Sequence, residues 1–178
     1  MMPIAPLMIE HRLIERMVRR IGLERLKLQR GGELDAVFLL EAIDFMRAYA
    51  DRCHHGKEED ILFSELERRP MSAELKRTME GLAQEHVLAR ELVSKMAELR
   101  EQYLGGDEFA AEKAANVLGR IADLYPKHIE KEDKEFFLPV MELFTKEDQA
   151  TMLERFYEFD RNLIHERYQR LVNKWEKN

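Results

Sequence analysis

HHGKEED, at residues 54–60, recurs as HIEKEDK at residues 128–134. In both copies a histidine is followed three residues later by a lysine, and the lysine is followed by two acidic residues. A lone histidine also precedes each copy: His11 lies 43 residues before the first copy, and His86 lies 42 residues before the second. The chain of 178 residues therefore contains the same arrangement of histidines twice.

The rest of the chain has the composition of a helical protein. Charged residues make up 36% of it, and it contains only 8 glycines and 5 prolines, which favours helix over loop and strand. Helix breaks are expected at RGGELD (30–35), RRPMSAE (68–74), LGGDEF (104–109) and ELFTKED (142–148). Between these breaks the sequence predicts five helical segments, at about 6–29, 34–68, 73–104, 108–143 and 146–176.

These segments are amphipathic and have recognisable starts. Ser72 is the expected N-cap of the third segment, and Thr145 with Asp148 has the spacing of a capping box at the start of the fifth. Apolar residues recur at helical spacing, and among them Val37 and Val87 are expected on the buried faces. Such faces are buried when the helices pack against one another.

Short connections make sequential helices antiparallel neighbours. The sequence therefore predicts an all-α fold, in which an up-down four-helix bundle spans about residues 5–143. An additional C-terminal fifth helix, at about residues 146–176, is expected to pack alongside it, within a single domain of residues 1–178.

Composition also argues against several classes of partner. The net charge is −6, from 35 acidic against 29 basic residues, so there is no excess of positive charge for nucleic-acid phosphates. Cys53 is the only cysteine, which rules out an internal disulfide. No apolar run reaches the roughly 18 residues that a membrane span needs. The N-terminus, MMPIAPLMIEHR, has neither a basic start nor a small-residue cleavage site, so a cytoplasmic protein is expected.

The repeated motif has the spacing of a metal site. On a helix, residues four apart lie on one face, about 5–6 Å apart at Cβ, so each motif histidine and the glutamate four residues later can address one point. With the two lone histidines, six side chains are expected to converge inside the bundle: His11, His54, Glu58, His86, His128 and Glu132. Imidazole and carboxylate favour Fe, Mn or Zn. Two ions that share both glutamates would each receive two nitrogens.

In sequence, this pattern resembles that of the hemerythrin-like proteins, also called the hemerythrin HHE cation-binding domain. The matching stretches are EHRL (10–13), HHGKEEDILF (54–63), EHVL (85–88) and HIEKEDKEFFLP (128–139), and the resemblance covers about residues 5–143. It implies a non-haem di-iron centre with the six residues above as ligands, for which zinc or manganese could substitute. Ferritin-like di-iron proteins have Glu-x-x-His on their helices. The order here is His-x-x-x-Glu, which argues against a ferritin-like site.

The resemblance also leaves two ligand positions open. Oxygen-carrying hemerythrins have a further histidine four residues after the one on the third helix, and this chain has Arg90 there. His165, on the fifth helix, is a candidate for the missing ligand, and the alternative is a buried histidine without metal contact. Asp133 stands at the spacing of a family aspartate and competes with Glu132, which the internal repeat favours.

Other polar residues near the motifs have simpler interpretations. His55 lies about 100° around an α-helix from its neighbour, so we expect it to be exposed or behind the ligands. Cys53 is expected to be a small buried residue. A solvated acidic face is the simplest interpretation of Glu59, Asp60, Glu130 and Glu135.

Three functions remain open at this point. The first is a di-iron, cation-binding protein that binds or senses O₂, NO or peroxide, or that handles iron. The second is a di-iron enzyme, either peroxidase-like or linked to repair after NO or iron–sulfur damage. The third is a structural helical bundle with incidental histidines. The expected partner is a small diatomic ligand or peroxide, with neither nucleic acid nor membrane involved.

Overall fold

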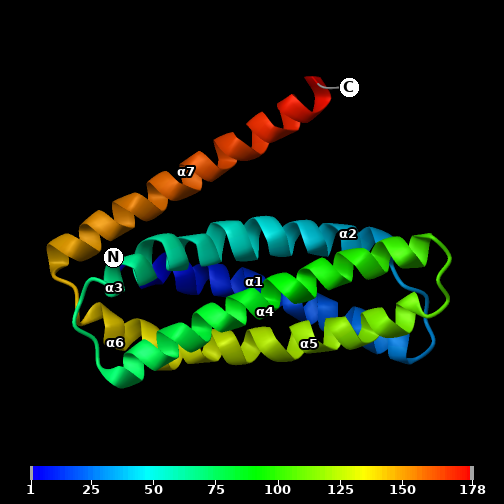
Figure 1. Ribbon diagram of the computed structural model, residues 1–178, viewed down its shortest axis with the longest axis horizontal. Coiled ribbons are helices and arrows are strands. Elements are labelled where there is room, and N and C mark those ends of the chain that lie inside the picture. The colour runs from blue at the N-terminus through cyan, green and yellow to red at the C-terminus, as the bar shows by residue number, and fades with distance from the viewer. Residues whose placement is uncertain (1, 177–178) are drawn as a thin grey trace.

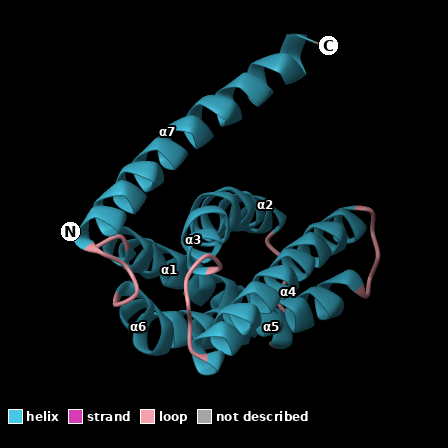
Figure 2. Ribbon diagram, turned by 60° about the vertical axis from the view of Figure 1, so that its left-hand side comes forward, coloured by secondary structure: helices cyan, strands magenta, loops and turns pink. Residues whose placement is uncertain are grey.

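The computed structural model describes the backbone of residues 2–176 and the side chains of residues 2–163. Every regular element in this part of the chain is a helix (Figures 1 and 2). The elements are α1 (Ile4–Gln29), α2 (Ala36–Phe45), η1 (Met46–His55), η2 (Glu58–Phe63), α3 (Ser64–Leu66), α4 (Ala73–Leu104), α5 (Ala110–Lys131), η3 (Glu132–Phe136), α6 (Phe137–Met141) and α7 (Lys146–Glu176). The elements labelled η are π-helical.

Several of these elements continue one another without a loop. α2, η1, η2 and α3 form one helical segment from residue 36 to residue 66, and α5, η3 and α6 form another from residue 110 to residue 141. With α1, α4 and α7, the described chain has five helical segments. The predicted all-α class and the five segments are confirmed, and the bounds of each segment lie within two residues of the expected ones.

The segments other than α7 lie side by side as a helical bundle (Figure 1). α1 packs along α5, α5 along α4, and α4 against α2, while η1 also contacts α1 and α4. α7 lies outside this group and contacts η1 and η2. Within the described residues, no helix is long and apolar enough to cross a membrane.

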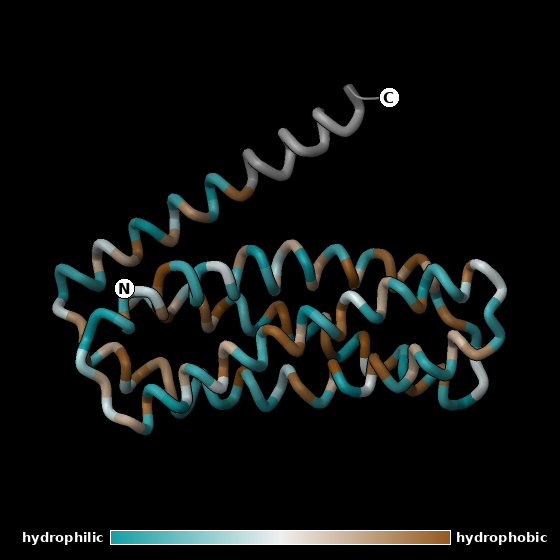
Figure 3. Tube along the Cα trace, viewed as in Figure 1, coloured by the Kyte–Doolittle hydropathy of each residue, from teal (hydrophilic) through white to brown (hydrophobic). Residues whose placement is uncertain are grey.

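The interior holds two apolar clusters. The larger one packs residues of α1, α2, α4 and α5, among them Leu39 and Met96, and the smaller one gathers residues of α1, η2, α4, α6 and α7. Hydrophobic and hydrophilic residues alternate along each helix (Figure 3). Val37 and Val87 were expected to be buried, but they are 68% and 52% exposed. The faces turned inward are those of Leu39 on α2 and of His86 and Ala89 on α4.

The helix starts follow the expected capping chemistry. Ser72 Oγ accepts a hydrogen bond from the backbone N–H of Leu75 at the start of α4. Ahead of α7, the backbone N–H of Asp148 donates to Thr145 Oγ1, and the backbone N–H of Thr145 donates to the Asp148 carboxylate. This is the reciprocal capping box that the sequence predicts.

The π-helical segments coincide with the two repeated motifs. η1 and η2 contain most of HHGKEED, and η3 begins at the glutamate of HIEKEDK. A π-helix closes i→i+5 hydrogen bonds, is rare, and often occurs at functional sites. The wider winding changes which side chains of the motif face the interior, as described below.

The packing of α7 is tested by two neighbouring aromatic residues. Phe156 is 1% exposed in the smaller apolar cluster, whereas Tyr157, the next residue on α7, is 53% exposed. We expect Phe156→Ala to lower the free energy of unfolding by about 3–5 kcal/mol, and Tyr157→Ala to change it by less than about 0.5 kcal/mol. Chemical denaturation followed by circular dichroism measures both. Equal effects of the two variants would show that α7 does not pack as described.

Candidate metal centre

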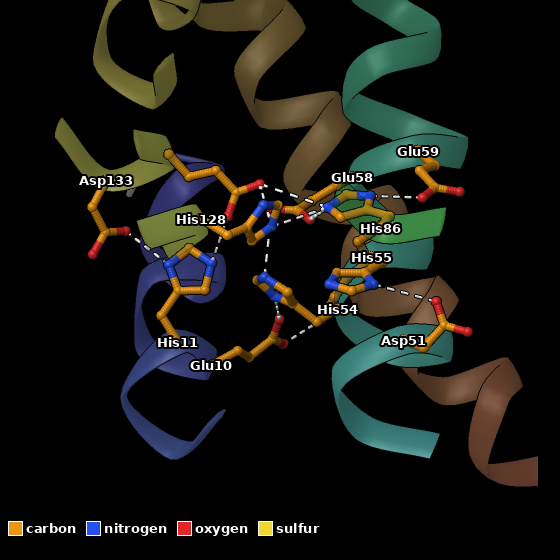
Figure 4. A network of polar contacts seen from close by, with 12 residues as sticks. Glu10, His11, Asp51, His54, His55, Glu58, Glu59, His86, His128 and Asp133 are labelled. Atoms are coloured by element: carbon orange, nitrogen blue, oxygen red, sulfur yellow. Dashed lines mark hydrogen bonds and ion pairs between the residues drawn. The ribbon is translucent and has the colours of Figure 1, made fainter. Parts of the chain in front are cut away.

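Five histidines and two glutamates meet between the helices, deep in the bundle. Figure 4 shows the five histidine rings with Glu58 among them. Every one of the seven side chains is buried, with an exposed fraction of 4% or less. They come from α1 (His11), η1 (His54 and His55), η2 (Glu58), α4 (His86), α5 (His128) and η3 (Glu132). The structure thus brings together the six residues predicted on the four bundle helices and adds His55.

The seven residues divide into two sets of potential ligands. In each set, one ligand atom from every member lies within 4.8 Å of the others. The first ligand group consists of His11, His54, Glu58 and Glu132. The second ligand group consists of His55, Glu58, His86 and His128. Glu58 belongs to both groups.

Both carboxylates reach across the two groups. One oxygen of Glu58 lies 3.5 Å from His54 Nε2, and the other lies 3.4 Å from His86 Nε2. One oxygen of Glu132 lies 3.1 Å from His11 Nε2, and the other lies 3.3 Å from His128 Nε2. Each glutamate therefore offers one oxygen to each group, which is the arrangement of a carboxylate that bridges two cations.

The polar atoms at the centre lack hydrogen-bond partners. Both oxygens of Glu58, both oxygens of Glu132, and the Nε2 atoms of His11 and His54 are buried without one. Burying a carboxylate is costly, because the charge loses its hydration and needs a hydrogen bond or an opposite charge in return. A divalent cation bound to these atoms would remove that cost, so the donor set fits a metal site.

Each histidine is held from behind by a carboxylate. The Nδ1 atoms donate to Asp133 from His11 (2.8 Å), to Glu10 from His54 (2.9 Å), to Asp51 from His55 (3.3 Å), to Glu59 from His86 (2.6 Å) and to Glu85 from His128 (2.8 Å). A proton fixed on Nδ1 leaves the lone pair of Nε2 free for a metal. All five imidazoles therefore have the tautomer and orientation of metal ligands.

The internal repeat explains where some of these carboxylates come from. The glutamate before each lone histidine binds the motif histidine of the same half: Glu10 accepts from His54, and Glu85 accepts from His128. The motif lysine contacts the same glutamate, as Lys57 does with Glu10 and Lys131 with Glu85. The glutamates and lysines that recur beside the ligand candidates are therefore parts of the site.

The second of the two acidic residues after each motif lysine binds the lone histidine of the other half. Glu59 accepts from His86, and Asp133 accepts from His11. Glu59 was expected on a solvated acidic face, and this expectation was wrong. Asp133 was considered as a competitor of Glu132 for the metal. It lies on the Nδ1 side of His11, away from the atoms that face the centre, whereas Glu132 lies on the Nε2 side.

Of the two expectations for His55, exposure to solvent was wrong. His55 is 2% exposed, and its ring stacks on the ring of His86 with centroids 3.8 Å apart. The expectation assumed α-helical geometry, but this stretch is π-helical. The wider turn allows both His54 and His55 to face the interior, each toward a different ligand group.

Arg90 stands four residues after His86, at the position where the sequence resemblance implies a further histidine. It does not face the ligands: its Nε donates to Asp51 at 2.8 Å, and its terminal nitrogen donates to Glu59 at 2.9 Å. It therefore holds the two carboxylates that orient His55 and His86. The prediction for His165 lies outside the residues whose side chains the structure describes.

The two bridging carboxyls have opposite acidities in the metal-free site. Burial and the adjacent charge of Glu132 raise the pKa of Glu58 well above its usual range. Burial would also raise the pKa of Glu132, but the neighbouring His128 and His11 lower it well below its usual range. Burial disfavours a charged His128, yet the charge of Glu132 raises its pKa to about 9. Burial thus favours the neutral form of Glu58, whereas the adjacent imidazoles favour the charged form of Glu132.

Comparison with known proteins gives one match. Residues 2–138 fit the family model of the hemerythrin HHE cation binding domain. The matched range contains both ligand groups and ends before α7. Neither the curated proteins nor the solved structures include a match to the chain.

Replacing Glu58 should stabilise the metal-free protein and weaken its stabilisation by metal, and both effects can be measured as changes in melting temperature. A carboxyl whose pKa is raised by folding destabilises the fold at pH values above its unfolded pKa of about 4.3. At pH 7, Glu58→Gln should therefore raise the melting temperature of the metal-free protein. It should also remove most of the rise that Zn²⁺ produces in the wild type, because a bridging carboxylate is lost.

Glu98→Gln is the matched control, because Glu98 has a 59% exposed side chain. Thermal unfolding with and without Zn²⁺ measures all three proteins. The interpretation of Glu58 would be contradicted if Glu58→Gln lowered the metal-free melting temperature and kept the wild-type response to Zn²⁺.

Proposed function

The chain belongs to the hemerythrin HHE cation-binding domain family, and from its seven buried donor residues we propose that it is a non-haem di-iron protein. In this proposal the four helical segments α1, 36–66, α4 and 110–141 form an up-down four-helix bundle around the metals. The short loops and the packing of neighbouring segments support that arrangement.

The bridging geometry of Glu58 and Glu132 carries the proposal of two ions. Each carboxylate has one oxygen near the first ligand group and one near the second. A single ion would leave half of these oxygens buried and unsatisfied. Imidazole and carboxylate together suit Fe, Mn or Zn, and iron is the metal that the hemerythrin resemblance implies.

The two ions would have unequal surroundings. The first ligand group has two imidazoles, whereas the second has three because His55 joins it. The repeat is broken at this point, since the residue after His128 is Ile129. An ion in the first group would therefore keep more open coordination positions, which is what a small diatomic ligand or peroxide needs.

A small cavity lies on the far side of His55. It has a volume of about 120 Å³, and Asp51, His55, Arg90 and Tyr125 are among its lining residues. A space of this size can hold a diatomic molecule or a peroxide. The cavity adjoins the second ligand group, so it supports access of a small molecule to the centre without assigning that molecule to one ion.

The buried side chains favour a protein that binds or senses O₂, NO or peroxide, or that handles iron, over an enzyme. Among the described residues, the buried ionisable side chains around the centre are its donors and the residues that hold them. Tyr125 is the observation that favours a peroxide-consuming enzyme instead. It is 3% exposed, and its ring lies 6.3 Å from that of His55, so its phenol is a possible hydrogen donor. Decay of H₂O₂ with iron-loaded wild type, slowed in Tyr125→Phe, would select the enzyme.

Anaerobic titration with Fe(II) tests the number of ions and the role of His55. The wild type should saturate at two equivalents, and saturation at one would contradict the proposal. His55→Ala removes one of three imidazoles from the second ligand group, so we expect one equivalent to weaken by more than about tenfold while the other is retained. His165→Ala is compared under the same conditions. A loss of affinity in His165→Ala, with His55→Ala unchanged, would place the additional ligand on α7.

A further inference from the structure

The two halves of the site differ in how their lysine–glutamate pairs are covered. In the second half, the side chains of Lys131 and Glu85 are 32% and 27% exposed. In the first half, Lys57 is fully buried and Glu10 is 12% exposed. The sequence repeat does not account for this difference, because both halves have the same residues at these places. The difference arises from α7, which packs over η1 and η2.

Asp160 of α7 is the second partner of the buried lysine. Lys57 Nζ contacts Glu10 and also lies 2.8 Å and 3.0 Å from the two oxygens of Asp160. The other oxygen of Glu10 accepts from His54 Nδ1 at 2.9 Å. A continuous chain of polar contacts therefore runs from a metal-ligand candidate, through Glu10 and Lys57, to a helix outside the bundle.

α7 also makes two close contacts around the same motif. Cys53 Sγ donates to Asp160 at 3.3 Å. A Cβ added at Gly56 would lie 2.7 Å from the ring of Phe159, so α7 approaches η1 as closely as it does because residue 56 has no side chain. This contact falls between His55 and Lys57, within the repeated motif.

The same cluster does not form a further metal site. Ligand atoms of Glu10, Cys53 and Asp160 lie within 4.8 Å of one another, but the ammonium group of Lys57 contacts both carboxylates. The lysine supplies the positive charge that these carboxylates need. The cluster is an ion-pair network, and α7 contributes its outermost member.

We propose that α7 is coupled to the metal centre, with Asp160 as a positioning residue that acts on His54 through Lys57 and Glu10. The inference rests on the proposed function in one respect, namely that the first ligand group binds a cation. A cation on His54 Nε2 makes the Nδ1–H group a stronger hydrogen-bond donor to Glu10. Glu10 then has less negative charge left to stabilise the ammonium group of Lys57. Asp160 provides a second carboxylate for the two cations. Occupation of the first group therefore tightens the docking of α7.

Linkage makes this coupling reciprocal. If the bound cation favours the docked helix, the docked helix must favour the cation by the same factor, and typical couplings are about 5–150-fold. Loss of the Asp160 charge should therefore weaken metal binding, although Asp160 touches no metal. The effect should be larger on one of the two ions, because the ion-pair contact of Asp160 leads through Lys57 and Glu10 to His54 of the first ligand group.

The experiment compares Asp160→Asn with Glu158→Gln in the full-length chain. Glu158 is an exposed residue two positions away on α7, so its substitution removes the same charge without touching Lys57. In titrations with Co(II), Asp160→Asn should bind one of two equivalents at least about fivefold more weakly and alter the d–d bands of that ion. Glu158→Gln should match the wild type. Equal affinities and spectra in the two variants would overturn the positioning role of Asp160.

Hydrogen–deuterium exchange of the wild type tests the reciprocal effect without any substitution. Backbone amides of residues 152–163 should exchange more slowly with Co(II) bound than without it. Unchanged exchange with both equivalents bound would overturn the coupling while leaving the proposed function intact. Failure of the wild type to bind Co(II) would overturn the proposed function itself.

A second variant covers the case in which Asp160→Asn does not fold. Phe159→Ala removes the ring that packs on Gly56 and leaves every charge of the network in place. It should accelerate exchange in α7 and weaken the same Co(II) equivalent. Faster exchange with wild-type Co(II) affinity would count against the coupling.

Discussion

The carboxylates of Glu58 and Glu132 set the constraint on which the rest of the structure depends. Both are fully buried, and none of their four oxygens has a hydrogen-bond partner. Burial of one ionised carboxylate costs several kcal/mol even after the protein relaxes. A raised pKa of Glu58 and the neighbouring imidazoles of Glu132 reduce this cost, but they do not explain why two carboxyl groups lie at the centre of an apolar bundle. The arrangement becomes reasonable when the four oxygens, together with five imidazoles, are donors to cations.

From these two carboxylates outward, basic and acidic side chains follow one another in layers. The imidazoles follow first, then the carboxylates that accept from every Nδ1, and then the cations that hold those carboxylates. Arg90 serves two of these acceptors, and Lys57 and Lys131 serve one each. Such outer contacts fix the orientation of the ligands and commonly change metal affinity by 10–100-fold. The helices therefore provide positions for a preorganised polar centre as well as an apolar core.

The sequence predicted the parts of this centre that depend on local spacing. The six ligand candidates on the four bundle helices follow from the doubled motif, and the five helical segments follow from composition, breaks and caps. His55 was missed because an α-helical angle was applied to residues that wind as a π-helix. The roles of Glu10, Glu59 and Glu85 depend on contacts between different helices, which spacing along one helix cannot reveal. Their recurrence in both halves was the available signal. Asp160 lies outside the repeat, so spacing could not predict its contact with Lys57.

Anomalous diffraction from crystals of anaerobically iron-loaded protein, recorded at the iron edge, tests the central claim most directly. The account predicts two iron peaks about 3.5–4 Å apart, the separation of known two-metal sites. One peak should lie beside His11 and His54, the other beside His55, His86 and His128, with Glu58 and Glu132 bridging them. A single peak, or iron bound away from these two glutamates, would contradict it.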